Sequence, residues 1–227
     1  MRKCGFAFGL GALAFVLVLL SLGCGSGSGT AQFRIVQASP SVPTSNVVID
    51  GTTQSDTMTY GSASSYVQIR SGSAHVQFIP VNTTTPTLDT HVSLGSGTNS
   101  TLVISGLSPN ISTTLLSDSQ TIPTAGDFSL RIMNAAPSLG PADVYIVPSG
   151  TNIASATPAI SALAFQSVSP YSSFTAGTFQ IFFTIPNTKT SLFDPQNISF
   201  SSAQNRTIIV LDGPVSGFTT VTLADLD

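Results

Sequence analysis

Residues 34–41 read RIVQASPS and residues 131–138 read RIMNAAPS, so one short pattern occurs twice in the chain. The same spacing relates NVVI at 46–49 to DVYI at 143–146. Matches continue toward the C-terminus with a larger offset, as expected where insertions fall in turns. We therefore interpret the chain as two copies of one domain that follow each other.

Within each copy, apolar and polar residues alternate. Val67 and Ile69 are separated by one polar residue, as are Val76 and Phe78. Glycine and proline interrupt the pattern at intervals of roughly 8–12 residues, which is typical of short antiparallel strands. Glutamate is absent and lysine is rare, so helix formers with charged tips are nearly missing. The sequence therefore predicts an all-β fold of two tandem antiparallel β-sandwiches of the immunoglobulin-like type.

The turn signals also set domain limits. We expect sandwiches at 31–118 and 127–227, joined by a linker at 119–126. Ser71, Gly72 and Ser73 lie between two alternating runs and predict a hairpin turn. Strands are expected at 32–37, 46–50, 65–70, 74–79, 88–94, 100–105 and 112–117, and in the second copy at 129–134, 142–147, 171–175, 178–185, 192–200, 206–211 and 217–223.

The N-terminus carries the pattern of an export signal. Arg2 and Lys3 precede an apolar stretch at 5–23, and Gly23 is followed by Cys24. A small residue before a cysteine at the end of an apolar run resembles the lipobox of bacterial lipoproteins. The resemblance implies a signal peptide at 1–23, cleavage after Gly23, and a lipid on Cys24 with further acylation, such as palmitate, at the new amino terminus. The alternative is an uncleaved transmembrane helix, since about 20 apolar residues span a bilayer.

Lipidation would place the protein in the bacterial cell envelope. A Gly/Ser-rich tether at 24–30 would hold the folded part close to the membrane, on its periplasmic or surface face. Gly25, and not Asp, follows the cysteine, and in this the chain resembles the lipoproteins that enteric bacteria send to the outer membrane. Cys4 would be removed with the signal peptide, so no disulfide is expected. The chain has 7 Lys+Arg against 10 acidic residues, and this balance argues against nucleic acid as a partner.

Four segments of the first copy resemble a known family. They are RIVQASP at 34–40, NVVIDG at 46–51, a glycine-centred pair of runs at 66–78 and NSTLV at 99–103. They are similar to the DUF4397 family, a domain of unknown function whose typical pattern reads VRVVHASPDAP followed by VDVY. The second copy keeps DVY at 143–145. The resemblance implies secreted or lipid-anchored β domains, often in tandem, with no assigned activity.

This sequence departs from the family pattern at several polar positions. Gln37 and Asn134 stand where the family has His, and Ser41 and Ser138 stand where it has an acid after the proline. Asn46 replaces a second acid in the first copy. Any ligand role that those residues have in relatives is therefore not carried over here.

His75 and His91 are the histidines of the chain. If the strands at 74–79 and 88–94 pair, both imidazoles lie on one solvent face. This arrangement suits a weak metal site or a pH-sensitive patch, but we favour two exposed strand residues, because zinc prefers three or four protein ligands and no third is indicated. Gln180 and Asn197 occupy the matching positions of the second copy.

Other polar residues allow two interpretations each. Asp118 and Asp127 flank the linker and could share Ca²⁺, although solvated acids are the preferred interpretation. Arg34 and Arg131 recur at matching positions of the two copies. They could contact an anion, but we prefer the interpretation that they are outward strand residues paired with Asp. Tyr66, Tyr171, Phe174 and Phe179 suit an aromatic sugar platform, or more simply core or hairpin pairs.

These features predict a non-enzymatic protein. No Gly-x-Ser-x-Gly motif occurs, and nothing indicates a catalytic residue, a cofactor or a metal ligand set. We expect a binding or structural role with a protein or glycan partner, in addition to the membrane contacted through Cys24. The alternative is an envelope polysaccharide hydrolase that uses paired Asp carboxylates.

Overall fold

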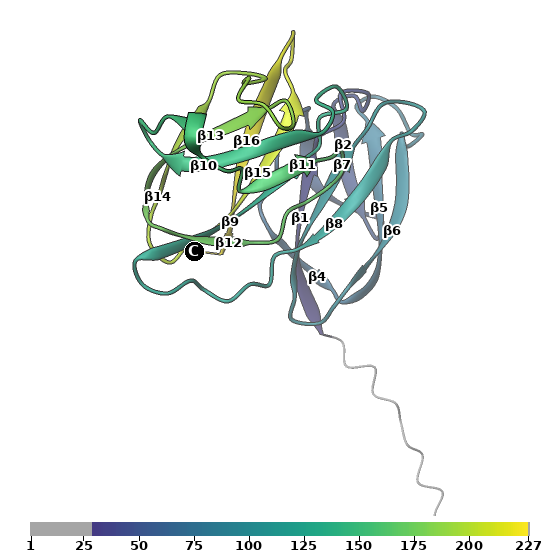
Figure 1. The fold of residues 1–227 in the computed structure, drawn as a ribbon. Coiled ribbons are helices and arrows are strands. Elements are labelled where there is room, and N and C mark those ends of the chain that lie inside the picture. The colour runs from purple at the N-terminus through teal and green to yellow at the C-terminus, as the bar shows by residue number, and fades with distance from the viewer. Residues whose placement is uncertain (1–28, 227) are drawn as a thin grey trace, which may run out of the picture.

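The computed structural model describes residues 29–226, so the predicted signal peptide, its cleavage site and Cys24 lie outside the described residues. The described part contains sixteen strands, one short 3-10 helix and no α-helix, which confirms the all-β class. Across residues 29–226, no helix combines the length and apolar character needed to traverse a bilayer. The strands form four sheets of four strands each (Figure 1).

The first half of the chain supplies two of the sheets. We call β4-β1-β7-β8 the first inner sheet and β3-β2-β5-β6 the first outer sheet. Within the first inner sheet β1 and β7 run parallel, and the other neighbours are antiparallel. The strands are β1 (Thr30–Gln37), β2 (Ser45–Ile49), β3 (Thr52–Met58), β4 (Val67–Arg70), β5 (Gly72–Pro80), β6 (Leu88–Leu94), β7 (Asn99–Ser105) and β8 (Ser112–Ser117).

The second half repeats this arrangement. The second inner sheet has the order β12-β9-β15-β16, again with a parallel central pair, and the second outer sheet has the order β11-β10-β13-β14. The elements are β9 (Asp127–Asn134), β10 (Ala142–Pro148), the 3-10 helix η1 (Ile153–Ser155), β11 (Ile160–Leu163), β12 (Ser172–Thr175), β13 (Gly177–Thr184), β14 (Gln196–Phe200), β15 (Asn205–Asp212) and β16 (Phe218–Leu226).

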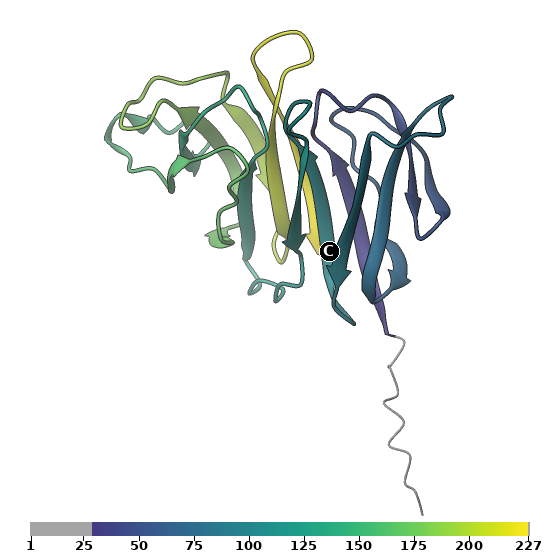
Figure 2. The same cartoon turned by 90° about the vertical axis from the view of Figure 1, so that its right-hand side faces the viewer.

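The four sheets stack as layers, with the two inner sheets face to face (Figure 2). Each sandwich has its own core between its inner and outer sheet: Phe33 and Phe78 belong to the first, Phe128 and Ile181 to the second. A third apolar cluster fills the space between the inner sheets. Its buried members are Val36, Ala38, Val103, Leu116, Met133, Ala135, Ile209, Leu211 and Leu223.

This layering explains the continuous apolar runs in the central strands. In β1, Ile35 belongs to the first core while Val36 belongs to the cluster between the inner sheets. In β7, Leu102 and Val103 divide in the same way. Successive side chains of a strand point to opposite faces, so a strand buried on both faces needs apolar residues at successive positions.

Each of the fourteen predicted strands overlaps an observed one, but β3 and β11 were not predicted. β3 reads TTQSDTM and β11 has four residues, so neither shows the apolar alternation on which the predictions rest. The predicted hairpin turn at 71–73 is wrong. β4 pairs with β1 in the inner sheet, whereas β5 pairs with β2 and β6 in the outer sheet. The chain crosses between sheets here, and Gly72 makes the corner with φ of +118°.

Candidate functional site

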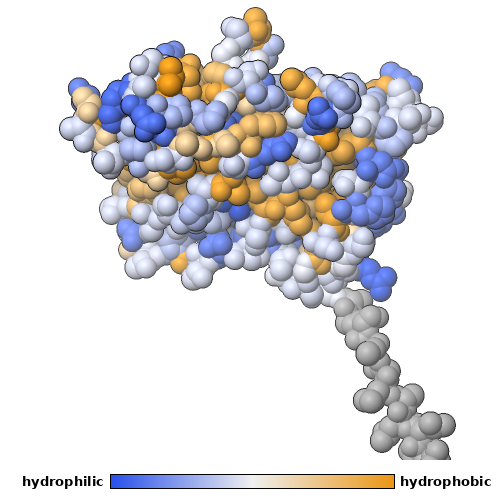
Figure 3. All heavy atoms as spheres, turned by 45° about the vertical axis from the view of Figure 1, so that its right-hand side comes forward, coloured by the Kyte–Doolittle hydropathy of each residue, from blue (hydrophilic) through white to orange (hydrophobic). Residues whose placement is uncertain are grey.

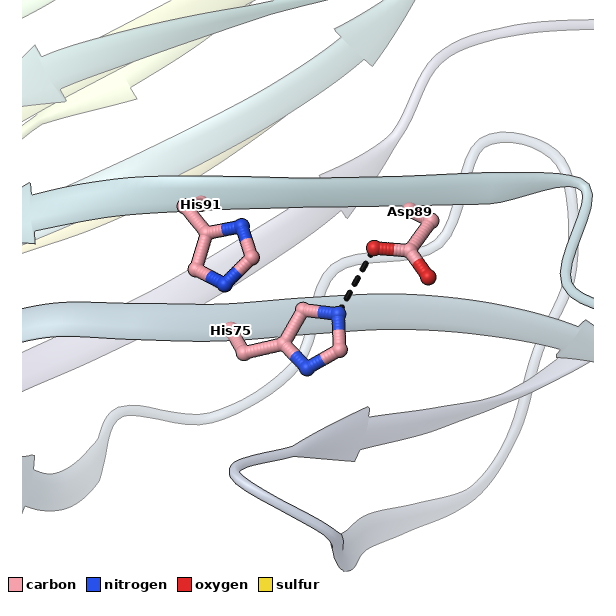
Figure 4. Close-up of side chains that lie close together, drawn as sticks. All are labelled: His75, Asp89 and His91. Atoms are coloured by element: carbon pink, nitrogen blue, oxygen red, sulfur yellow. Dashed lines mark hydrogen bonds and ion pairs between the residues drawn. The ribbon is translucent and has the colours of Figure 1, made fainter.

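The strongest gathering of metal-ligating side chains lies on the first outer sheet. β5 and β6 pair antiparallel with His75 directly opposite His91, so both imidazoles project from the same face. The two rings stack with centroids 4.4 Å apart and planes 5° apart (Figure 4). The structure thus brings together the two histidines in the way that the expected strand pairing implied.

Asp89 joins the two histidines. It lies two positions before His91 on β6, so both side chains share a face. Its Oδ1 lies 2.6 Å from His75 Nε2, and Gln77 Nε2 donates to its Oδ2 at 2.7 Å. The sequence analysis named no third ligand. The signal that points to Asp89 is the Asp-x-His spacing, because residues two positions apart on a strand share a face. We call His75, Asp89 and His91 the His-Asp-His cluster.

The cluster is exposed and polar. His75 is half-buried, while Asp89 and His91 are exposed. The hydrogen bond from Gln77, followed by the one from His75, lowers the pKa of the Asp89 carboxyl below its usual value. With a lowered pKa, the carboxylate is ionised at neutral pH, as a metal ligand must be. Hydrophilic residues gather on the side of the first outer sheet in Figure 3.

The corresponding face of the second sandwich has no histidine pair and is partly covered. Gln180 and Asn197 form the directly opposed pair of β13 and β14 that corresponds to His75 and His91. Tyr145 and Val147 on the outer face of β10 are buried with Ile153 of η1. The segment between β10 and β11 thus covers part of this face. In the first sandwich, β2 and β3 are joined by a two-residue turn, so no comparable segment follows β2.

Arg34 connects the two sandwiches at the inner sheets. It is only 4% exposed. Its guanidinium donates to Asp225 Oδ1 at 2.6 Å and to the Ala224 carbonyl at 2.7 Å, both in the second sandwich. It also donates to Thr101 Oγ1 in its own sandwich and lies 4.4 Å from the ring centroid of Tyr66. Buried charge is thereby matched by an opposite charge and by hydrogen bonds.

Arg131 makes the reciprocal set of contacts. It donates to Asp118 and, at 2.7 Å, to the Ser117 carbonyl, both in the first sandwich. Within its own sandwich it donates to Thr207 and lies 4.6 Å from the ring centroid of Tyr171. The same pattern therefore occurs twice, with the sandwiches exchanged. We call the eight side chains the interdomain lattice: Arg34, Tyr66, Thr101, Asp118, Arg131, Tyr171, Thr207 and Asp225.

Each of the two lattice carboxylates also accepts hydrogen bonds from side chains of its own sandwich. Asp118 accepts hydrogen bonds from Thr101 at 2.5 Å and from Tyr66 at 2.7 Å. Asp225 accepts from Thr207 at 2.5 Å and from Tyr171 at 2.8 Å. Both carboxylate side chains are fully buried.

Several sequence interpretations need correction here. Arg34 and Arg131 do pair with Asp, but they are buried between sheets instead of pointing outward, because each inner sheet has a second sheet on both sides. Asp118 is a buried ion-pair partner and not a solvated linker acid. The tyrosines of the suggested sugar platform lie in the lattice, with hydroxyls engaged by carboxylates.

The lattice tyrosines should make the folded state less stable at alkaline pH. Burial, reinforced by the neighbouring carboxylates, raises the pKa of Tyr66 and Tyr171, and burial also raises the pKa of Tyr60 to about 12. A raised folded-state pKa leaves stability intact below the ordinary tyrosine pKa of about 10 and removes it as pH climbs toward the folded value. We expect the urea concentration at the unfolding midpoint to decrease as the pH rises from about 10 to about 12, with ionisation of Tyr66 and Tyr171 appearing only on unfolding.

A paired substitution checks this assignment. Tyr66→Phe with Tyr171→Phe removes both hydroxyls, so the slope of stability against pH in this range should become shallower. Ionisation of all tyrosines in the folded protein with a midpoint near pH 10 would contradict the expectation.

Comparison with known proteins gives a family match and several distant matches to solved structures. The model of a family described as "Domain of unknown function (DUF4397)" matches residues 31–145. No curated protein matches the chain. Among solved structures, the Bacillus anthracis TIE protein is 11% identical with a TM-score of 0.27, over 87% of this chain and 43% of that one. A structure titled "Alpha-glucan binding by a streptococcal virulence factor" is 12% identical with a TM-score of 0.25, over 79% and 92%.

The extent of these matches limits what they mean. The chain spans less than half of the length of the Bacillus anthracis protein. TM-scores this low do not indicate a shared function. The family match, by contrast, covers the whole first sandwich and reaches Tyr145 in β10.

Proposed function

Because the chain belongs to the DUF4397 family, a family of unknown activity, we propose its role from its own structure: an exported, lipid-anchored protein of the bacterial cell envelope with a non-enzymatic binding or structural function. The observation that carries the structural part of this proposal is the interdomain lattice, which together with the apolar cluster between the inner sheets makes the two sandwiches one block. Such a block suits a rigid module that presents its outer sheets to a partner.

The place where the chain enters the block supports membrane anchoring. β1 begins at Thr30, at one end of the layered structure (Figure 2). Cys24 lies six residues earlier in the sequence. A flexible segment of that length reaches only about 14 Å, so a lipid on Cys24 would hold the block beside the bilayer.

The three buried acids support a non-enzymatic role over polysaccharide hydrolysis. Asp118 and Asp225 are buried in the lattice. Asp143 accepts hydrogen bonds from the backbone N–H groups of Ala162 and Asn187, which fixes two loops. Glycoside hydrolysis needs two carboxyl groups that face a substrate cleft. These three carboxylates instead hold parts of the fold together.

The anchoring is tested by fatty-acid labelling in the native bacterium. The wild-type chain should incorporate labelled fatty acid and lose residues 1–23, and Cys24→Ser should abolish the label because the acceptor thiol is gone. Cys4→Ser is the matched control, since Cys4 lies in the segment that is removed, and it should label normally. Label that persists in Cys24→Ser would contradict the proposal.

A second experiment tests the non-enzymatic role. The purified wild-type chain should release no product from envelope polysaccharide. Release of product that is lost in a single Asp→Asn variant would favour the hydrolase.

A further inference from the structure

We propose that the His-Asp-His cluster on the first outer sheet binds one divalent transition-metal ion, of the zinc, nickel or copper class, through an imidazole nitrogen from each histidine and a carboxylate oxygen of Asp89. This inference goes beyond the proposed function and does not depend on it. The carrying observation is geometric: one ligand atom from each residue lies within 4.8 Å of the others.

That spacing is close to what one ion requires. Zn²⁺ holds nitrogen and carboxylate oxygen ligands at about 2.0–2.2 Å, so two ligand atoms on the same ion lie roughly 3–4 Å apart. Because the two imidazole rings lie nearly parallel, they must also turn so that one nitrogen of each points at the ion. This rotation, with a shift of about one ångström, is open to side chains that are exposed or half-buried. The strand register does the coarse positioning, because it sets His75 opposite His91 and places Asp89 on the same face.

The surroundings prepare the carboxylate for a metal. Gln77 donates to Asp89 Oδ2 at 2.7 Å and thereby leaves Oδ1 facing the histidines. His75 Nε2 now lies 2.6 Å from that oxygen, so an ion inserted between them would replace one hydrogen bond with two coordination bonds. Hydrogen bonds to a ligating carboxylate orient it and strengthen metal binding. Gln77 is thus a positioning residue for the site.

The backbone beneath the cluster is also fixed. Asp50 Oδ1 accepts a hydrogen bond from the His75 backbone N–H at 2.9 Å, and the Asp50 N–H donates to the His75 carbonyl at 2.9 Å. These bonds tie the β2–β3 turn to the β5 strand at the position that carries the first imidazole.

The donor set selects the class of metal. Two imidazoles with one carboxylate suit zinc, copper and nickel, whereas Ca²⁺ and Mg²⁺ prefer sites of six or more oxygen ligands. Three protein ligands leave at least one coordination position open. Because Asp89 and His91 are exposed, that position faces solvent and is accessible to a further ligand.

The second sandwich supplies a conservative test variant. Gln180 and Asn197 occupy the same opposed positions, so His75→Gln with His91→Asn introduces residues that this fold already accepts there. An untagged, full-length chain in detergent is stripped with a chelator and titrated with Zn²⁺ by calorimetry, and with Co²⁺ by visible absorption. We expect one ion per chain and no competition from excess Ca²⁺.

The variants should then form a graded series. The double variant and Asp89→Asn should each weaken Zn²⁺ binding by more than about 100-fold, and Gln77→Ala by about tenfold, because loss of a ligand costs more than loss of its hydrogen-bond partner. Unchanged circular dichroism would show that the fold is kept. Wild-type affinity in the double variant, or no saturable Zn²⁺ binding by the wild type, would overturn the proposal and leave the envelope function unaffected.

Discussion

Replacing Arg131 with methionine should destabilise the fold by about 3–5 kcal/mol, the usual cost of leaving a buried charge without its partner. Asp118 would keep the hydrogen bonds from Thr101 and Tyr66 and the longer ion pair with Arg34 at 3.8 Å. It would lose its hydrogen-bonded partner, the guanidinium that reaches it from the second sandwich. Methionine fills a similar volume, so the change removes charge more than packing. The measurement is the midpoint of urea unfolding for the full-length chain.

Arg70→Met is the matched control for this prediction. Arg70 is exposed at the end of β4, and its loss should change stability by no more than about 0.5 kcal/mol. A double-mutant cycle that adds Asp118→Asn should show coupling of roughly 0.5–3 kcal/mol with Arg131→Met, because the two groups share one network. Equal effects of the two arginine substitutions would refute a stabilising role for the lattice.

A carboxylate placed between the inner sheets should be almost as damaging. Ile209 is fully buried in the apolar cluster that joins the two sandwiches. Ile209→Asp introduces a charge among apolar side chains, and we expect a loss of about 3–5 kcal/mol. Because the substitution weakens the contact between the inner sheets, limited proteolysis within 119–126 should also become faster.

Val215→Asp provides the comparison. Val215 is 96% exposed in the loop between β15 and β16, so the same kind of substitution there should leave both the urea midpoint and the proteolysis rate nearly unchanged. If Ile209→Asp behaved like Val215→Asp, the inner sheets would not be held together by this cluster.

The elements that the sequence predicts well are those with a strong period-two pattern. In β5 and β6 more buried and less buried residues alternate along most of the strand, and both strands were located within about two residues. β3 escaped prediction because its residues are largely polar. The crossing at Gly72 escaped because alternation shows that a strand has two faces without showing which sheet it joins.

The interdomain lattice could not be predicted from the sequence for a different reason. The recurrence of Arg34 and Arg131 is visible in the sequence, but each arginine bonds an acid of the other copy, far along the chain for Arg34. Only the stacking of the inner sheets brings these residues together. Asp89 was closer to prediction, since the pairing that joins His75 to His91 also places residue 89 beside them.

The reciprocity of the lattice has a consequence for assembly. Each copy of the domain contributes an arginine and accepts one, so the contact is of the isologous kind that otherwise joins identical subunits of a twofold dimer. Here the two halves are covalently linked through 119–126, which makes their encounter intramolecular. Dilution of the protein therefore cannot separate them, and the pairing holds however sparsely the chain is distributed.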